Sequence, residues 1–292
     1  MSSFSKLLLR LALLALLLPA APLFAQVPAG FASQPIFNQT FSGNSLNTAV
    51  WSYRGVDAQR DDCYLTRKAV QVGDGFVRIH TYTAKDANGT TKNYCGAITT
   101  ENGSFLHSYG YWVANLRFHY EKGMQCAFWI QSPHISQIIN DPKQSGTEMD
   151  IFEHVHFKKG QDAYDHAVIW NGYGKDSRDV PFFSHSKELT DGKFHTFGLA
   201  WTPEHLDFYV DGKLDWHLTA SDAAISGIAE YLILDTELPS ASVVPKTGYG
   251  PEGAASNPYL DVKSVRVYPY VGPYIDAAGQ DAANPSSKGS KK

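Results

Sequence analysis

Three acidic side chains, Glu148, Asp150 and Glu153, lie within six positions of an otherwise apolar, β-prone stretch. Successive side chains of a strand point to opposite faces, so Glu148 and Asp150 share one face. One extra residue after Asp150, a β-bulge, would bring Glu153 to that face as well. Acids so close together repel each other, which moves their pKa values apart. An ionised nucleophile beside a protonated acid is the pair that hydrolysis of a glycosidic bond with retention requires.

The spacing E-x-D-x-x-E on an apolar strand resembles the catalytic signature of glycoside hydrolase family 16. That family includes laminarinases, mixed-linkage β-glucanases, agarases, porphyranases and carrageenases. The resemblance runs from about Phe37 to Tyr268, because segments 37–43 and 260–268 look like the family's first and last core strands. It implies a glycosidase whose partner is a polysaccharide substrate.

The resemblance also implies a role for each acid. Glu148 would attack the anomeric carbon as nucleophile, and Glu153 would act as general acid and then as general base. Asp150 would steer the ionisation of Glu148 and help to keep Glu153 protonated before the attack. A surface charge ladder or a metal site is the alternative interpretation, which the buried-looking apolar neighbours disfavour.

Four further residues are candidates for substrate binding. Trp129 points away from the core-facing residues of its strand and could stack on a pyranose ring, with peripheral packing as the alternative. His166 could hydrogen-bond the nucleophile or a sugar hydroxyl, although a lone strand histidine fits a structural role equally well. Trp170 and Asn171 lie at the end of the same strand, where they could form a wall of the cleft.

The expected activity is endo-acting, retaining cleavage of β-1,3- or β-1,3/1,4-glucan. Few arginines or lysines cluster around the expected site strands, which disfavours sulfated galactans. An agar- or carrageenan-type galactan nevertheless stays as the alternative substrate, and transglycosylation stays open because it uses the same acids. A non-catalytic carbohydrate-binding module is the weaker alternative, because it has no use for three repelling acids.

The pattern of turns and alternation predicts the fold class. Asp-Gly and Asn-Gly pairs recur at short intervals, and alternating runs such as Trp112, Ala114 and Leu116 lie between them. Many short strands without intervening helices predict an all-β, two-sheet antiparallel β-sandwich. The resemblance implies a concanavalin A-like jelly roll with a concave substrate cleft.

The chain divides into three parts. Residues 1–25 are predicted to be a secretory signal peptide, because Lys6 and Arg10 flank a short apolar run that small residues follow. A retained membrane anchor is the alternative, although the run is short for a bilayer. Residues 26–274 would form one catalytic domain, and the polar stretch 275–292 is expected to be a disordered tail. We expect a secreted or periplasmic monomer that has no membrane contact after cleavage.

The overall composition limits which kinds of partner molecule are expected. The formal net charge is −4 and the charges are scattered without a basic stripe, so nucleic acid is not expected as a partner. The six Trp and 16 Tyr residues suit a large core and also a sugar-binding site, where flat rings stack on apolar pyranose faces.

The cysteines leave two alternatives. Export would place Cys63, Cys95 and Cys126 in an oxidising compartment, which favours disulfides. Cys126 alternates with core-facing residues, which leaves Cys63 and Cys95 as the candidate pair. Three free thiols are the alternative, because spacing alone does not fix connectivity.

The expected chemistry requires no cofactor, but the resemblance implies a structural calcium ion far from the acids. Its ligands would be the carbonyl oxygens of Thr40 and Gly75 and the carboxylate of Asp261. The acidic pair that precedes the first-strand Phe in the family is absent here, where the chain reads Gln39-Thr40.

Overall fold

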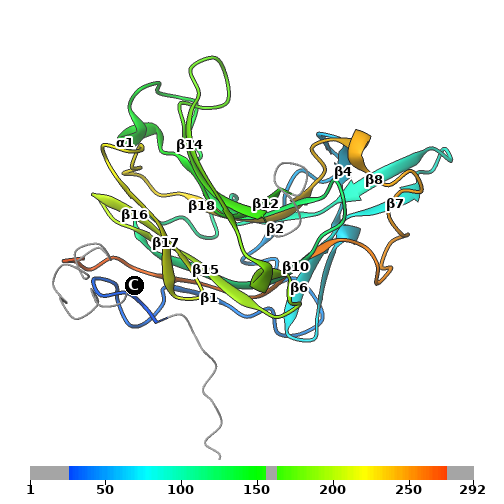
Figure 1. Ribbon diagram of the computed structural model, residues 1–292, viewed down its shortest axis with the longest axis horizontal. Coiled ribbons are helices and arrows are strands. Elements are labelled where there is room, and N and C mark those ends of the chain that lie inside the picture. The colour runs from blue at the N-terminus through cyan, green and yellow to red at the C-terminus, as the bar shows by residue number, and fades with distance from the viewer. Residues whose placement is uncertain (1–25, 156–162, 275–292) are drawn as a thin grey trace, which may run out of the picture.

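A computed structural model describes residues 26–155 and 163–274 as two large β-sheets packed face to face, with a smaller sheet at one end (Figure 1). Within these residues the strand pairs are antiparallel, except for β4 (Cys63–Leu65) with β8 (Thr91–Cys95). The prediction of an all-β, two-sheet sandwich is therefore confirmed. The expected signal peptide (1–25) and tail (275–292) lie outside the described residues.

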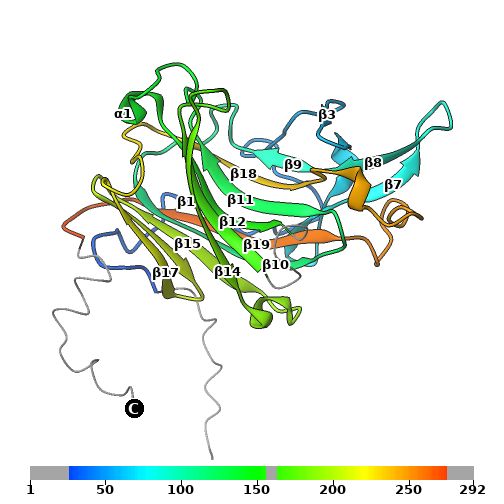
Figure 2. The ribbon, with the colours of Figure 1, turned by 45° about the horizontal axis from the view of Figure 1, so that its top comes forward.

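The two large sheets, parts of which Figure 2 labels, have the following strand orders. The eight-stranded sheet consists of β17 (Lys213–Thr219), β16 (His205–Val210), β15 (His195–Trp201), β10 (Gly110–His119), β19 (Tyr259–Tyr268), β6 (Phe76–His80) and β5 (Val70–Gly73), with β1 (Phe37–Gln39) also paired to β19. The seven-stranded sheet consists of β14 (Arg178–His185), β13 (Ala163–Trp170), β12 (Glu148–Val155), β11 (Gln125–Gln131), β18 (Tyr231–Glu237), β9 (Ala97–Thr99) and β2 (Ser52–Tyr53).

The small sheet and the short helices complete the fold. The small sheet has the order β3 (Gln59–Arg60), β4 (Cys63–Leu65), β8 (Thr91–Cys95) and β7 (Tyr82–Lys85). The helical elements are α1 (Pro142–Ser145) and the 3-10 helices η1 (Arg67–Ala69), η2 (Lys187–Thr190) and η3 (Ala241–Val243). In the described ranges, no helix is long and apolar enough to cross a membrane.

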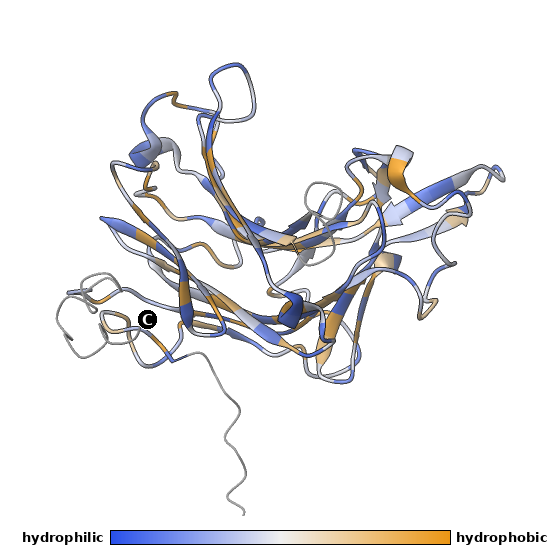
Figure 3. Ribbon diagram, in the orientation of Figure 1, coloured by the Kyte–Doolittle hydropathy of each residue, from blue (hydrophilic) through white to orange (hydrophobic). Residues whose placement is uncertain are grey.

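The hydrophobic core fills the space between the two large sheets. Hydropathy alternates along their strands, as expected when one face of each strand is buried (Figure 3). Phe152 of β12 and Phe197 of β15 contact each other across the core, with ring centroids 4.4 Å apart. Burying each such side chain stabilises the fold by about 1.5–3 kcal/mol. One face of the seven-stranded sheet therefore lies against this core, and the opposite face is the one available for a site.

The small sheet is tied together by a disulfide. Cys63 of β4 and Cys95 of β8 are bonded, with their Cα atoms 5.9 Å apart, which is one of the two alternatives that the sequence left open. Cys126 is a buried free cysteine. Arg60 lies opposite Cys63 in the β3–β4 pair, and its guanidinium group forms an ion pair of 2.6 Å with Glu237 of β18. The disulfide therefore anchors a hairpin that extends an arginine to the seven-stranded sheet.

Candidate active site

The strand that carries the three acids contains a β-bulge. Phe128 of β11 lies opposite Phe152, but the next residue, Trp129, lies opposite Asp150, so Ile151 is an extra residue in β12. Ile151 and Phe152 are both fully buried in the core. Glu153 consequently returns to the face of Glu148 and Asp150. We call this side of the seven-stranded sheet the acidic face.

The start of β12 is fixed by a glycine and by a buried acid. Gly146 has a φ of +74°, and a Cβ atom there would lie 2.3 Å from the Cβ atom of Ser132. The backbone nitrogen and the hydroxyl of Thr147 donate hydrogen bonds of 2.8 and 3.1 Å to Oε1 of Glu230. Complete burial raises the pKa of Glu230 to about 8. These contacts hold Thr147 in place and so fix the point at which β12 begins with Glu148.

Glu148 is 8% exposed and is held by two donors. Gln131 Nε2 donates a hydrogen bond of 2.8 Å to its Oε2 atom, and the hydroxyl of Tyr173 donates to the same oxygen. Burial raises the pKa of Glu148, while the hydrogen bonds from Tyr173 and Gln131 and the charges of Arg60 and Arg54 oppose that rise. The environment thus combines a dry site with donors aimed at the carboxylate.

The amide of Gln131 has a defined orientation. Its Oε1 atom accepts a hydrogen bond from the hydroxyl of Tyr231 and another of 3.3 Å from Nη2 of Arg54. Since the amide oxygen faces these donors, the amide nitrogen must face Glu148. Gln131 therefore connects two neighbouring side chains to the first acid.

Asp150 is the acid with the strongest reason to stay protonated. It is buried between the other two, and burial raises its pKa well above the usual range. The charges of Glu148, Glu153 and Asp165 raise the pKa of Asp150 further. A neutral Asp150 places no negative charge beside its neighbours on the acidic face, so one of them can ionise more easily.

Glu153 is half-buried, in contrast to the other two acids. Gln125 Nε2 donates a hydrogen bond to its Oε1 atom. Glu153 lies opposite Ala127 on one side and Asp165 on the other. A solvent-accessible carboxyl at one end of a buried acidic row can exchange protons with a leaving group or with water.

Trp129 lies on the acidic face but is only 5% exposed. Its Nε1 atom donates a hydrogen bond of 3.2 Å to Asp235 Oδ2. The guanidinium carbons of Arg54 and Arg60 lie 5.1 and 5.6 Å from the centre of its ring, within cation–π range. The predicted sugar platform is thus a buried ring with two arginines close to it, and its contact with substrate stays a prediction.

A second acidic pair lies on the neighbouring strand β18. Asp235 lies opposite Ala127 and Glu237 opposite Gln125, so both share the acidic face. Burial raises the pKa of Asp235, and burial together with the charge of Asp235 raises the pKa of Glu237 well above its usual range. We did not predict Asp235, although alternation along 231–237 places these two acids on one side.

The other predicted substrate-binding residues lie elsewhere. His166 is a correction, because it is fully buried on the core side of β13, where neither a sugar nor Glu148 can reach it. Asn171 is 3% exposed and exchanges hydrogen bonds of 2.8 and 3.1 Å with Asn140, which gives it a role in the loop. Trp170 is half-buried and packs against the core.

Tyr173, which sequence reasoning missed, is 59% exposed beside Glu148.

The residues at Asp261 do not fit a calcium ion. Arg78 Nε and Nη2 donate hydrogen bonds of 2.7 and 2.8 Å to the two carboxylate oxygens, and Arg117 Nε donates one of 2.9 Å. Two guanidinium groups therefore occupy the positions that a cation would need, and their charge would repel it. Across the described ranges, no group of three or more His, Cys, Asp or Glu residues is arranged to hold a metal ion.

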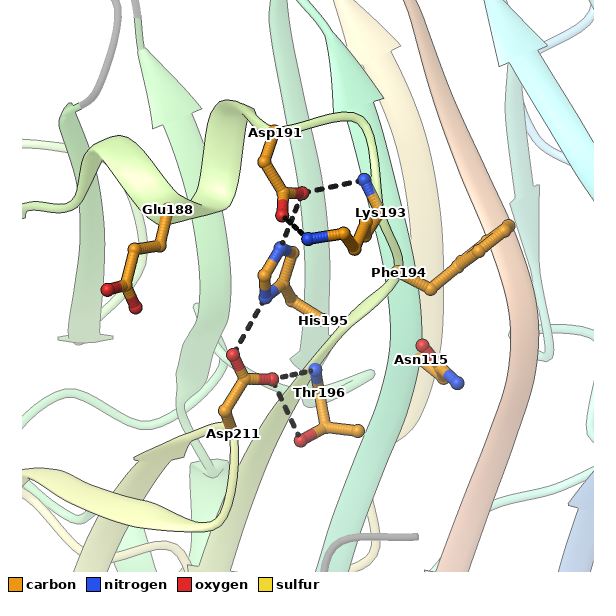
Figure 4. A pocket seen from close by; sticks show the side chains of 8 residues that line it. All are labelled: Asn115, Glu188, Asp191, Lys193, Phe194, His195, Thr196 and Asp211. Carbon is orange, nitrogen blue, oxygen red and sulfur yellow. Dashed lines mark hydrogen bonds and ion pairs between the residues drawn. The ribbon is translucent and has the colours of Figure 1, made fainter. Parts of the chain in front are cut away.

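A separate cavity of about 530 Å³ lies on the outer face of the eight-stranded sheet (Figure 4). Its centre is His195, whose ring contacts Asp211 at 2.7 Å and Asp191 at 3.2 Å. The hydrogen bond to Asp211 raises the pKa of His195. The cavity is lined by Asn115, Glu188, Asp191, Lys193, Phe194, His195, Thr196 and Asp211. None of the three acids of β12 contributes to it.

Comparison with known proteins agrees with this geometry. The sequence profile described as Glycosyl hydrolases family 16 matches residues 58–233, which is more than half of the chain. No protein of curated function matches the chain significantly.

Several solved structures share the fold. The endo-beta-1,3-glucanase from Pyrococcus furiosus is 20% identical, with 85% of this chain and 98% of that chain covered and a TM-score of 0.64. The laminarinase from Rhodothermus marinus is 21% identical, with coverages of 82% and 98% and a TM-score of 0.65. A family 16 protein of the Bacteroides ovatus mixed linkage glucan locus is 17% identical, with coverages of 79% and 99% and a TM-score of 0.64. These likenesses agree with the jelly-roll prediction.

Proposed function

Because the chain belongs to glycosyl hydrolases family 16 and is therefore a glycosidase, we propose that it cleaves internal β-1,3- or β-1,3/1,4-linkages of a neutral glucan with net retention. Glu148 attacks the anomeric carbon and forms a glycosyl-enzyme. Glu153 protonates the leaving oxygen and then activates the water that releases the sugar.

The observation that carries this proposal is the bulge that brings Glu148, Asp150 and Glu153 to one face. Glu148 is buried under two hydrogen-bond donors, which suits a positioned nucleophile. Glu153 is more accessible, which suits a group that exchanges protons with solvent. Asp150, whose pKa is raised by burial, separates the two without adding a second fixed negative charge.

The charge of the acidic face supports a neutral substrate. Glu148, Asp150 and Glu153 share it with Asp235 and Glu237. The two arginines near Trp129 already form ion pairs, Arg54 with Glu101 and Arg60 with Glu237. A sulfated galactan would therefore find both of these arginines already paired with carboxylates, and so less able to bind its sulfate groups. The solved structures that carry the names endo-beta-1,3-glucanase, laminarinase and mixed linkage glucan support a glucan.

We also propose that the protein acts outside the cytoplasm. The pattern of residues 1–25 is that of a secretory signal, and the Cys63–Cys95 disulfide suits an oxidising compartment.

The test is release of reducing ends from a panel of laminarin, lichenan, agarose and carrageenan, with Glu148→Gln as the matched control. We expect cleavage of laminarin, of lichenan or of both, and loss of activity by about 10⁴-fold or more in a folded Glu148→Gln. Proton NMR of the first-formed product should show the β anomer. Cleavage of carrageenan alone would overturn the substrate, and an α anomer would overturn the double displacement.

A further inference from the structure

Two β-bulges face each other across the core. The first places Ile151 as the extra residue in β12 of the seven-stranded sheet. The second lies in β17 of the eight-stranded sheet, where Phe208 pairs with Trp216 but Tyr209 pairs with Leu214, so Asp215 is the extra residue. An extra residue in a strand is not held by the regular ladder of hydrogen bonds, so its position needs another contact.

His166 supplies a contact to each bulge. Its Nδ1 atom lies 2.8 Å from the carbonyl oxygen of Ile151, and its Nε2 atom lies 3.2 Å from Oδ2 of Asp215. The hydroxyl of Tyr164 donates a hydrogen bond of 2.7 Å to the same Asp215 oxygen. His166 is fully buried, so its contact with Ile151 is shielded from water, whereas the side chain of Asp215 is 24% exposed.

Both partners of the imidazole are acceptors. A carbonyl oxygen and a carboxylate can only accept, so the imidazole is the donor in a hydrogen bond to either of them. Phe208 stacks on the ring with centroids 4.8 Å apart and planes tilted by 30°, and Phe182 lies nearly parallel to it at 6.1 Å and 8°. Partial burial would raise the pKa of Asp215, but the hydrogen bonds from His166 and Tyr164 lower it. The ring is thus fixed in its plane and along both of its hydrogen-bond directions.

We propose that His166 is a positioning residue for Glu153, acting by holding the bulge carbonyl of Ile151 against the Asp215 bulge of the opposite sheet. Strand geometry gives the reason, because a slip of one residue turns every following side chain to the other face. Loss of the bulge would therefore turn Glu153 toward the core while Glu148 and Asp150, which precede it, keep their places. This inference rests on the proposed role of Glu153 as general acid.

The experiment compares two aryl β-laminaribiosides that differ in the leaving group. A dinitrophenolate leaves without a proton, whereas a phenolate of ordinary basicity needs the general acid. His166→Leu removes both hydrogen bonds at similar volume. We expect it to lower kcat on the phenyl glycoside by about 10²-fold, the scale of general acid catalysis, and kcat on the dinitrophenyl glycoside by about threefold or less.

Two further variants refine the test. His166→Asn places its amide nitrogen near the position of Nδ1 and can still donate to Ile151, so its ratio of the two kcat values should stay closer to wild type. His80→Leu is the matched control, since His80 is a buried histidine of β6 whose ring nitrogens have no hydrogen-bond partner in the described part of the chain. It should leave the ratio unchanged.

The outcomes separate the inference from the proposed function. An unchanged ratio in His166→Leu, or an equal loss on both substrates, overturns the positioning role. Should that variant fail to fold, Asp215→Asn decides, because it must shift the ratio in the same direction and an unchanged ratio overturns the proposal. Persistent activity of Glu148→Gln on the dinitrophenyl glycoside would instead overturn the proposed function itself.

Discussion

Nε2 of Gln131 lies 2.8 Å from Oε2 of Glu148, while the other end of the same amide accepts the hydroxyl of Tyr231. The amide therefore cannot turn without losing a hydrogen bond at both ends. It presents a fixed donor to a buried carboxylate, and a donor to the charged form favours ionisation. Gln131 therefore lowers the pKa of Glu148 against the rise that burial causes.

Gln131→Leu should move the acid limb of the activity profile to higher pH. Burial raises the pKa of Glu148 and the hydrogen bond from Gln131 lowers it, so removing that hydrogen bond lets the pKa rise. A nucleophile must be ionised, so activity should then appear only at higher pH. The measurement is kcat/KM against pH, which reports the macroscopic pKa of the coupled acids in the free enzyme.

The control for this experiment is Gln71→Leu, because Gln71 is exposed on β5 of the other large sheet. It should leave the acid limb in place. An acid limb that stays put or moves downward in Gln131→Leu would refute the role of the amide.

Trp129→Ala should mainly cost stability. The indole is 5% exposed and donates to buried Asp235, so its removal leaves a cavity and takes one hydrogen bond from that acid. We expect a loss of about 3–5 kcal/mol in the free energy of unfolding, measured by urea denaturation. Trp129→Phe, which keeps a ring near Arg54 and Arg60, should lose less.

The same variants test the sugar platform predicted from the sequence. If the ring stacks on a pyranose, Trp129→Ala should raise KM for long oligosaccharides by the equivalent of about 1–3 kcal/mol, with a smaller effect for short ones. A raised KM with an unchanged urea midpoint would show that substrate, rather than the fold, depends on this ring.

Removal of divalent cations should leave the melting temperature unchanged. Arg78 and Arg117 already neutralise the carboxylate of Asp261, so no cation is needed there. Asp261→Asn, in contrast, should lower the free energy of unfolding by about 1–3 kcal/mol, because two charged donors lose the negative charge and one of the two acceptor oxygens that they share. Thermal melts with and without EDTA check the first expectation, and elemental analysis that finds bound calcium would contradict it.

Glu230 should make the protein less stable as the pH rises. Its folded pKa of about 8 lies above the ordinary value of 4.5, so the folded state keeps a proton that the unfolded state has lost. The contribution is fully present below about 4.5 and is lost as the pH rises to about 8, with a slope of about 1.4 kcal/mol per pH unit.

Glu230→Gln should remove that slope, since it keeps the amide oxygen for Thr147 but cannot ionise. Urea denaturation at several pH values measures the difference between variant and parent, which should grow across this window. The exposed acid Glu204 offers the control, because Glu204→Gln should follow the parent at every pH. A constant difference for Glu230→Gln would refute the buried proton.

The sequence alone determined the class of fold and the acids that share a face. Alternation with a period of two is a local property of a strand, so apolar runs and turn pairs suffice to predict a sandwich. The insertion of Ile151 could be anticipated for the same reason, because Glu153 joins Glu148 only if one residue is added between them. The pairing of Cys63 with Cys95 was predicted less directly, because it depended on assigning Cys126 to the core from the alternation of its strand.

Only the tertiary structure decided which groups meet from distant parts of the chain. His166 lies opposite the bulge and faces the core, because the register between β12 and β13 shifts there, and register depends on pairing rather than on the sequence of one strand. Asp261 is paired with Arg78 and Arg117 across three strands, which alternation along its own strand could not reveal. The contact of Asp215 with His166 joins a strand of one large sheet to a strand of the other. The separation of these residues along the chain does not predict it, because it forms only when the two sheets pack together.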